Sequence, residues 1–198
     1  PRVALAPATA DAILPAELVE TALSGGDLSE ADQRAVGLAL VTGAGAPRSL
    51  AAGLELLAGL AEAGDGPAAM ALSDALETRD LGAAYRWALA AGAAGETGAA
   101  ARLDWLEARL GLAEVLEIQE EVSGEDVHDA ANLSSIADIR DQAAMRLSGR
   151  ALARAYGIAA MWAMIGAAAG DPEAADILDE IDDRMRMADE AGRERWAA

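Results

Sequence analysis

The sequence predicts an all-α fold built from antiparallel pairs of helices, and three observations support this prediction. The chain has 198 residues, of which 53 are Ala and 25 are Leu, two of the strongest helix formers. Aromatic residues make up only 3% of the chain, whereas a β-sandwich would use more aromatic and β-branched residues. A spaced pattern of small and large residues also recurs along the chain, which is typical of helical repeat proteins.

Composition and charge exclude several classes of protein. The apolar fraction of 53% is too high for a disordered acidic tail, and the absence of Cys excludes disulfides and thiolate chemistry. The formal net charge is −19, and all 15 basic residues are Arg. Such an acidic chain argues against nucleic acid or an anionic membrane surface as the partner.

The start of the chain and its longest uncharged run give expectations about location. The run at 155–170 is shorter than the roughly 20 apolar residues that a membrane span needs, so we predict a buried Ala-rich helix and no membrane span. The Ala- and Pro-rich stretch that begins at Pro1 predicts an extended arm. The missing initial Met is consistent with removal of a secretory signal and also with trimming; we expect a periplasmic protein, with the cytoplasm as the alternative.

One five-position pattern recurs three times without gaps. A small residue is followed by a large apolar residue three positions later. Gly stands eight positions after the large residue, Ala stands four positions after that Gly, and Leu stands four positions after that Ala. The three copies are Gly53, Leu56, Gly64, Ala68 and Leu72; Ala84, Trp87, Gly95, Ala99 and Leu103; and Ala159, Trp162, Gly170, Ala174 and Leu178. A degenerate copy has Ala113, Leu116 and Gly124, but carries His128 and Asn132 where Ala and Leu would stand.

The pattern predicts how consecutive helices meet. Its Gly ends a first helix, because glycine adopts the left-handed conformation at little cost. Acidic residues follow these glycines and suit the positive N-terminus of the second helix: Asp65, Glu96, Glu125 and Asp171. The Ala and Leu of the pattern line the inner face of the second helix, where Ala permits close backbone approach. We therefore predict a pair formed by the helix that ends in Gly and the helix after it.

Turn signals rich in Gly, Pro, Ser and Asp separate the predicted helices in order along the chain. The helices are predicted at 15–24, 29–43, 48–63, 66–78, 80–94, 96–110, 111–123, 126–147, 150–169, 172–187 and 188–196. The helix at 126–147 is the longest, and apolar residues such as Ile139 and Leu147 fall on one of its faces.

No Pro- or Ser-rich linker divides the chain, so we predict one curved helical-repeat domain over residues 1–198. Its predicted parts are an N-terminal arm and first helix (1–28), repeats (29–110), a degenerate or elaborated repeat (111–154), and a C-terminal repeat with a capping helix (155–198).

The best-defined repeat resembles a known family. Val36-Gly37 and the loop Gly43-Ala-Gly45-Ala-Pro47-Arg-Ser49 are similar to the Leu-Gly pair and the Gly-x-Gly-Val-x-x-Asp loop of the Sel-one-like repeats, which are relatives of the tetratricopeptide repeats. The chain departs from the family at Leu56, where Trp is usual, and at Ser49, where Asp is usual.

The C-terminal segment resembles the last repeat of many bacterial members, with Arg184-Met185 near the end of an acidic helix and Trp196 near the end of the last helix. The resemblance covers residues 36–110 and 155–196. It implies a right-handed α-solenoid that serves as an adaptor or scaffold for other proteins, in bacteria often at the cell envelope.

No residue pattern predicts a catalytic, cofactor or metal site. His128 lies beside acidic residues, but one His falls short of the ligand sets of catalytic zinc sites. The glycines at 42–46 and 92–98 lack the Lys or the preceding strand that nucleotide-binding loops need. Two groups of carboxylates are spaced suitably for glycoside chemistry, and we interpret them as solvated helix faces: Glu117, Glu120 and Glu121; and Asp176, Asp179, Glu180 and Asp183.

The tryptophans divide into two groups. Trp87 and Trp162 occupy the large position of the repeat, which predicts core packing for them. Trp105 and Trp196 lie outside that position, so we predict that they belong to an interface.

The leading hypothesis is a non-enzymatic protein–protein interaction scaffold, an accessory subunit of a bacterial envelope assembly such as a flagellar motor or a secretion machine. We expect it to form a hetero-complex with protein partners that carry Arg on their surfaces, rather than to act as a lone monomer. Two alternatives stay open: a periplasmic protein that acts on glycan or peptidoglycan through paired carboxylates, and a cytoplasmic regulatory binding protein.

Overall fold

A computed structural model of the chain describes residues 13–124 and 135–197, and the side chains of these residues up to 190. The described residues form helices and turns and contain no strand. The described ranges contain ten helices: α1 (Ala16–Leu23), α2 (Glu30–Thr42), α3 (Leu50–Glu62), α4 (Gly66–Leu76), α5 (Leu81–Ala93), α6 (Ala99–Glu107), α7 (Leu112–Ser123), α8 (Ile136–Ser148), α9 (Tyr156–Ala168) and α10 (Pro172–Ala197). The predicted all-α class is therefore confirmed.

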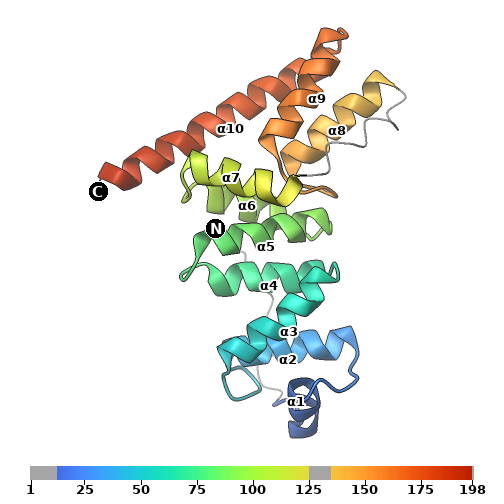
Figure 1. Cartoon of the computed structure of the whole chain (residues 1–198), viewed down its shortest axis with the longest axis vertical. Helices are drawn as coiled ribbons and strands as arrows, with labels where there is room; N and C mark the ends of the chain where they lie inside the picture. Colours follow the sequence, from blue (N-terminus) through green and yellow to red (C-terminus); the bar gives the residue numbers. More distant parts are fainter. Residues whose placement is uncertain (1–12, 125–134, 198) are drawn as a thin grey trace.

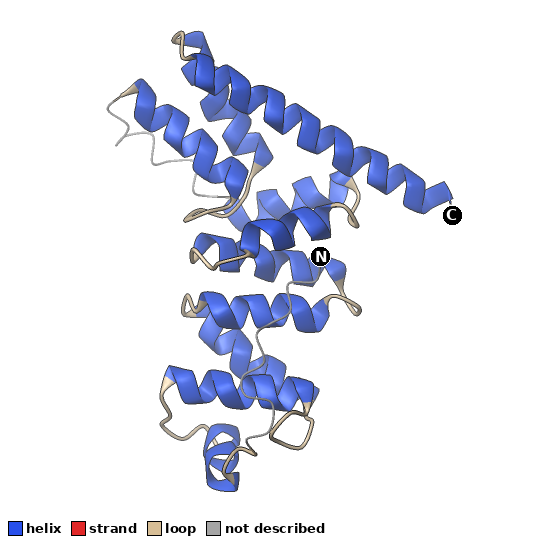
Figure 2. Cartoon of the chain, turned by 180° about the vertical axis from the view of Figure 1, so that it is seen from behind, coloured by secondary structure: helices blue, strands red, loops and turns tan. Residues whose placement is uncertain are grey.

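The helices are stacked one after another along the longest axis of the molecule (Figure 1). The stack runs from α1 at one end to α8, α9 and α10 at the other, and the view from behind shows the same order (Figure 2). The long helix α10 crosses its end of the stack obliquely. No described helix has the length and apolarity that a membrane crossing requires.

The glycines of the repeat end their helices as the sequence predicts. Gly64, Gly95 and Gly170 have φ angles of +96°, +76° and +91°, in the left-handed region that favours glycine. The degenerate copy differs, because Gly124 follows α7 with a φ of −53° and continues the right-handed conformation. The next positions of that copy, His128 and Asn132, lie outside the described residues.

Two of the predicted acidic residues cap the helices that follow them. Asp65 accepts a hydrogen bond of 2.8 Å from the backbone N–H of Ala68 at the start of α4. Asp171 accepts one of 3.0 Å from the N–H of Glu173 in α10. Glu96 does not cap α6, because that helix begins only at Ala99, after Gly98.

The predicted pairs α3 with α4, α5 with α6, and α9 with α10 are in contact, but they are not the most extensive contacts in the stack. The most extensive contacts join α2 with α3, α4 with α5, and α8 with α9, so each helix that ends in the repeat Gly packs most closely on the helix before it. The reason is visible at Gly53 of α3, where an added Cβ would lie 2.8 Å from the carbonyl oxygen of Gly37 in α2. In this copy of the pattern, the small residue Gly53 permits the close approach of the preceding helix.

Besides the shifted start of α6, three predictions of helix extent are wrong. The helix expected at 126–147 is described only from Ile136, where the Ser135 side chain accepts a hydrogen bond from the N–H of Asp138. The helix expected at 150–169 begins at Tyr156, because the preceding turn contains left-handed residues at Gly149 and Ala151. The two helices expected at 172–187 and 188–196 form the single helix α10, in which no Pro follows the first position.

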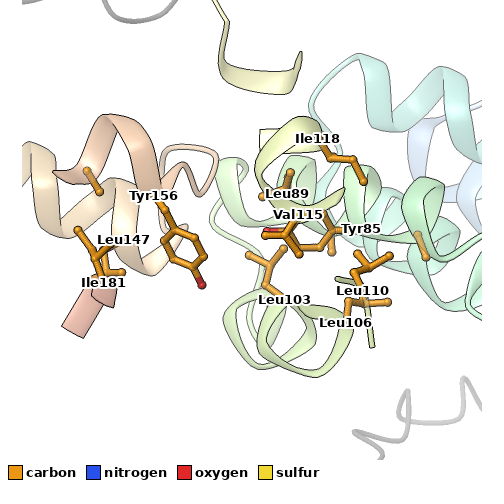
Figure 3. Close-up of a cluster of buried hydrophobic side chains, with 13 residues drawn as sticks. Tyr85, Leu89, Leu103, Leu106, Leu110, Val115, Ile118, Leu147, Tyr156 and Ile181 are labelled. Carbon is orange, nitrogen blue, oxygen red and sulfur yellow. The ribbon is translucent and has the colours of Figure 1, made fainter. Parts of the chain in front are cut away.

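The largest apolar cluster lies where the stack meets α9 and α10 (Figure 3). Its buried members come from the six helices α5 to α10 and the turn after α6, and include Leu89, Leu103, Val115, Leu147 and Ile181. Core packing is confirmed for Trp162, which is buried, while Trp87 is half-buried against the neighbouring cluster of α3 and α4.

Candidate functional site

A buried carboxylate lies inside the largest apolar cluster. The Glu107 side chain at the end of α6 accepts hydrogen bonds from the Tyr85 hydroxyl (2.6 Å), from Arg154 Nη1 (3.0 Å) and from the Tyr156 hydroxyl. Glu107 is only 6% exposed, and burying a charge is costly unless it is paired and hydrogen-bonded. Both oxygens of Glu107 are therefore occupied by donors from α5, α9 and the turn before α9.

Gln119 of α7 completes this network. Its Nε2 donates to the Tyr85 hydroxyl (2.7 Å), and its Oε1 accepts from the backbone N–H of Tyr156 (2.8 Å). We refer to Tyr85, Glu107, Gln119, Arg154 and Tyr156 as the Glu107 network. Figure 3 shows its two tyrosines among the apolar side chains. The network connects α5, α6 and α7 with the start of α9.

Arg154 is held in the turn between α8 and α9 and is 1% exposed. Its Nη1 also donates to Asp104 Oδ1 (2.7 Å), and its Nη2 donates to the carbonyl oxygen of Ser148 (3.2 Å). Burial lowers the pKa of Arg154, but attraction to Glu107 and Asp104 outweighs burial and raises this pKa above its usual value. The guanidinium therefore stays charged inside the fold.

The environment also keeps both tyrosines neutral. Burial raises the pKa of Tyr85 well above its usual range, and the nearby charge of Glu107 raises it further. Burial likewise raises the pKa of Tyr156, with Glu107 adding to the effect and Arg154 opposing it. Both hydroxyls consequently act as hydrogen-bond donors to Glu107.

A pocket of about 460 Å³ opens beside this network, between α6 and α10. We call it the α6–α10 pocket. Its lining residues are Asp104, Glu107, Ala108, Glu180, Asp183, Arg184, Met187 and Ala188. Ala108, Ala188 and Met187 give it apolar surface, and Met187 is 57% exposed. A pocket of this size accommodates one or two side chains or a small ligand.

One arginine spans the pocket from α10 to α6. Arg184 Nη1 donates to Asp104 Oδ1 (2.8 Å), and Arg184 Nε donates to Glu180 Oε1 (3.0 Å). Asp104 thus receives both Arg184 from the pocket and Arg154 from the network. Asp183, also on the wall, pairs with the exposed Arg186 at 2.8 Å.

Of the two predicted interface residues, Trp105 and Trp196, the structure describes the side chain of Trp105 only. Trp105 is half-buried on α6 and does not line the pocket, although the neighbouring Asp104 does. The guanidinium carbons of Arg102 and Arg109 lie 4.9 Å and 3.4 Å from the centroid of its ring, within the range of cation–π interactions. Trp196 falls in the last turns of α10, where side chains lie outside the described residues.

The carboxylates singled out from the sequence are separated by the fold. Glu180 and Asp183 line the α6–α10 pocket, whereas Asp176 and Asp179 do not. The group on α7 is absent from that lining too, and Glu121 instead accepts a hydrogen bond of 2.8 Å from Arg86 Nη2.

The only histidine lies in a segment outside the described residues. His128 and its acidic neighbours Glu125, Asp126 and Asp129 all fall within 125–134. Elsewhere, in the part of the chain that the structure describes, no group of three or more His, Cys, Asp or Glu side chains is arranged to hold a metal ion.

Sequence reasoning missed the Glu107 network and Asp104. One signal could have found Glu107: it falls on the inward stripe of α6 between Leu103, Leu106 and Leu110, which are all buried. A Glu on such a stripe requires buried partners. No local pattern points to those partners, because Tyr85 and Arg154 are 22 and 47 positions away from Glu107.

Comparisons of the chain with protein families and with curated proteins identified no relative. No protein-family model matches the chain, and no curated protein matches it significantly. The resemblance to the Sel-one-like repeats therefore remains an expectation that rests on the residues given above.

Proposed function

We propose that this protein is a non-enzymatic binding module, an adaptor or scaffold that holds protein partners. The observation that carries this proposal is the linear stack of packed helices, which leaves a long surface for its size and a pocket between α6 and α10. Helical repeat proteins use extended surfaces of this kind to bind other proteins. The proposal includes a right-handed α-solenoid, in line with the Sel-one-like resemblance.

Charge supports one class of partner. The net charge of −19 favours protein surfaces that carry Arg, and the resemblance favours an accessory role in a bacterial envelope assembly such as a flagellar motor or a secretion machine. A periplasmic location is part of the same proposal.

Affinity capture from the native host, followed by reconstitution with the purified candidate partner, tests the proposal. We expect a stable hetero-complex whose association rate falls steeply as salt rises, because the acidic surface steers encounter. A chain that is isolated as a lone monomer at micromolar concentration, with nothing co-purifying, would contradict the scaffold role. Association that is insensitive to salt would exclude the acidic surface as the contact.

A second candidate function is glycan or peptidoglycan hydrolysis. The observation that favours it is the convergence of Asp104, Glu107, Glu180 and Asp183 on one pocket, because glycosidases act through paired carboxyl groups. Two facts weigh against it: Glu107 has both oxygens occupied, and none of the lining residues that the structure describes is aromatic. Turnover of a glycan that is lost in Glu180→Gln, with an unchanged fold, would establish hydrolysis over binding alone.

A further inference from the structure

The α6–α10 pocket combines apolar surface with an excess of negative charge. Ala108, Met187 and Ala188 supply apolar atoms. The four lining carboxylates have three arginine partners, Arg154, Arg184 and Arg186, which leaves an excess of one negative charge. Methionine side chains are flexible and adapt to different ligand shapes. The chemistry of the lining therefore fits a group with an apolar stem and a cationic head.

The pocket already holds one guanidinium in place. Arg184 uses Nη1 for Asp104 and Nε for Glu180, so the two carboxylates from opposite walls lie at distances that suit a planar guanidinium. The hydrogen bonds that these two carboxylates accept from described residues all fall on Asp104 Oδ1 and Glu180 Oε1, so Asp104 Oδ2 and Glu180 Oε2 accept none from that part of the chain. These two oxygens are available to a second cation.

On the α6 wall of the pocket, Asp104 is fixed in position by the buried Glu107 network. Asp104 is 51% exposed on the pocket side, yet its Oδ1 is tied to the buried Arg154, which is bonded in turn to Glu107. A carboxylate whose position is set before the ligand arrives binds with a smaller entropic cost. The Glu107 network therefore positions the wall that a ligand would contact.

From this arrangement we propose that the α6–α10 pocket receives an arginine side chain of a partner protein. The proposal rests on the proposed binding function and names the contact. The partner's guanidinium bonds to the free oxygens of Asp104 and Glu180 beside Arg184, and its aliphatic stem packs on Met187 and Ala108. Arginine suits this site better than lysine, because its planar fork can bond to two carboxylates at once.

The test uses the full chain and short synthetic peptides as probes. One peptide carries a single Arg between Leu and Ala, with blocked ends; the matched peptides carry citrulline or Lys in its place. Backbone amide shifts are followed by NMR as each peptide is added. We expect a saturable shift confined to 104–108 and 180–188, with a dissociation constant on the order of 1 mM for Arg, weaker binding of Lys and none of citrulline.

Two charge-matched double variants separate this pocket from general attraction. Glu180→Gln with Asp183→Asn removes two charges from the rim, and we expect about 3- to 10-fold weaker binding of the Arg peptide. Glu117→Gln with Glu120→Gln removes the same charge from the exposed face of α7, and we expect a change of less than about 2-fold.

Arg184 gives a test in the opposite direction. In Arg184→Gln the internal guanidinium no longer competes for Asp104 and Glu180, so we expect the Arg peptide to bind about 2- to 10-fold more tightly. The control is Arg86→Gln, which removes one positive charge from α5, where the Arg86 side chain is 43% exposed. This substitution should change binding of the Arg peptide by less than about 2-fold. Circular dichroism confirms that each variant keeps its helices.

Three outcomes would overturn the proposal: no saturable shift with the Arg peptide, equal binding of the citrulline peptide, or equal loss in both double variants. The result is separable from that of the proposed function. A captured partner that binds the Glu180→Gln, Asp183→Asn variant as tightly as the natural chain leaves the scaffold role standing and refutes the pocket. If the chain binds the Arg peptide specifically but no protein partner is found, the pocket proposal stands and the scaffold role is refuted.

Discussion

Glu107 shows how a single side chain connects distant parts of this chain. It takes hydrogen bonds from residues of α5 and α9 and from Arg154 in the turn between α8 and α9. Each donor would lose its partner if the carboxylate were removed, and a buried guanidinium without a counter-charge is strongly unfavourable. The residue therefore contributes to stability mainly through the groups that it satisfies.

The first prediction concerns removal of this carboxylate. Glu107→Ala is expected to lower the free energy of unfolding by about 3–5 kcal/mol, because Arg154 and the two tyrosine hydroxyls lose their acceptor. Urea denaturation measures the change. Glu117→Ala, on an exposed face of α7, is the control and should stay within about 0.5 kcal/mol of the natural chain. If both variants had similar free energies of unfolding, the Glu107 network would contribute little to stability.

The second prediction concerns alkaline pH. The pKa values of Tyr85 and Tyr156 are raised in the folded state, so the unfolded chain loses these protons first as pH rises. Their contribution is fully present below about pH 10, the unfolded value, and is lost as pH rises towards the folded values. Unfolding free energy measured in urea at several pH values should fall above about pH 10, by up to about 1.4 kcal/mol per pH unit for each tyrosine.

The variant Tyr85→Phe with Tyr156→Phe is the control for this slope. It is less stable at neutral pH, because two hydrogen bonds to Glu107 are lost, but its stability should depend less on pH between about 10 and 12. The same alkaline slope in the double variant would assign the effect to other groups.

At the scale of helices, glycine sets the distance between α2 and α3. A Cβ on Gly53 would lie 2.8 Å from Val41 Cγ2 and 2.9 Å from the backbone nitrogen of Val41. Gly59, on the same helix, has nothing within 4 Å of an added Cβ. The two positions share a helix and differ in their neighbours.

The third prediction uses this pair. Gly53→Ala should destabilise the protein by about 1–3 kcal/mol, because α2 must move away from α3. Gly59→Ala should instead stabilise it by about 0.5–1 kcal/mol, because Ala has the better helix propensity and meets no neighbour. Thermal or urea unfolding of both variants measures whether each substitution lowers or raises the free energy of unfolding. A stabilising Gly53→Ala would contradict the close approach.

At the scale of the whole molecule, each helix packs mainly on its neighbours in the stack. The α1 end has a small cluster, in which Ala22, Val36 and Leu40 are the buried members. The α5–α10 region has the largest cluster and also the Glu107 network. In such an arrangement stability differs along the axis, because distant helices do not support one another directly.

The fourth prediction follows from this gradient. In hydrogen–deuterium exchange, the amides of α1 should exchange fastest and those of α5 and α6 slowest. Glu107→Gln should raise exchange in α5, α6 and α9 and leave the rates in α1 nearly unchanged. Uniform protection from α1 to α9 would instead indicate a single cooperative unit.

Much of this architecture follows from local sequence. Helix formation, the glycine-terminated turns and the buried small residues depend on backbone preference and on spacings of three and four residues, which a sequence displays directly. Trp162 and Gly64 are where that reasoning places them. Which helices pack most closely depends on the shape of both surfaces, as at Gly53 and Gly37. The sequence pattern therefore predicted pairs that are in contact, but it did not show that α3 packs more extensively on α2 than on α4.

The candidate site was decided only by tertiary contacts. Asp104 and Arg184 are separated by 80 positions, and their pairing depends on where α10 crosses the stack. The charge pattern predicted solvated faces for Glu180 and Asp183, and their side chains are 54% and 69% exposed, but the pattern did not show that they line a pocket. The pocket arises from the helix that packs opposite, and that helix is α6.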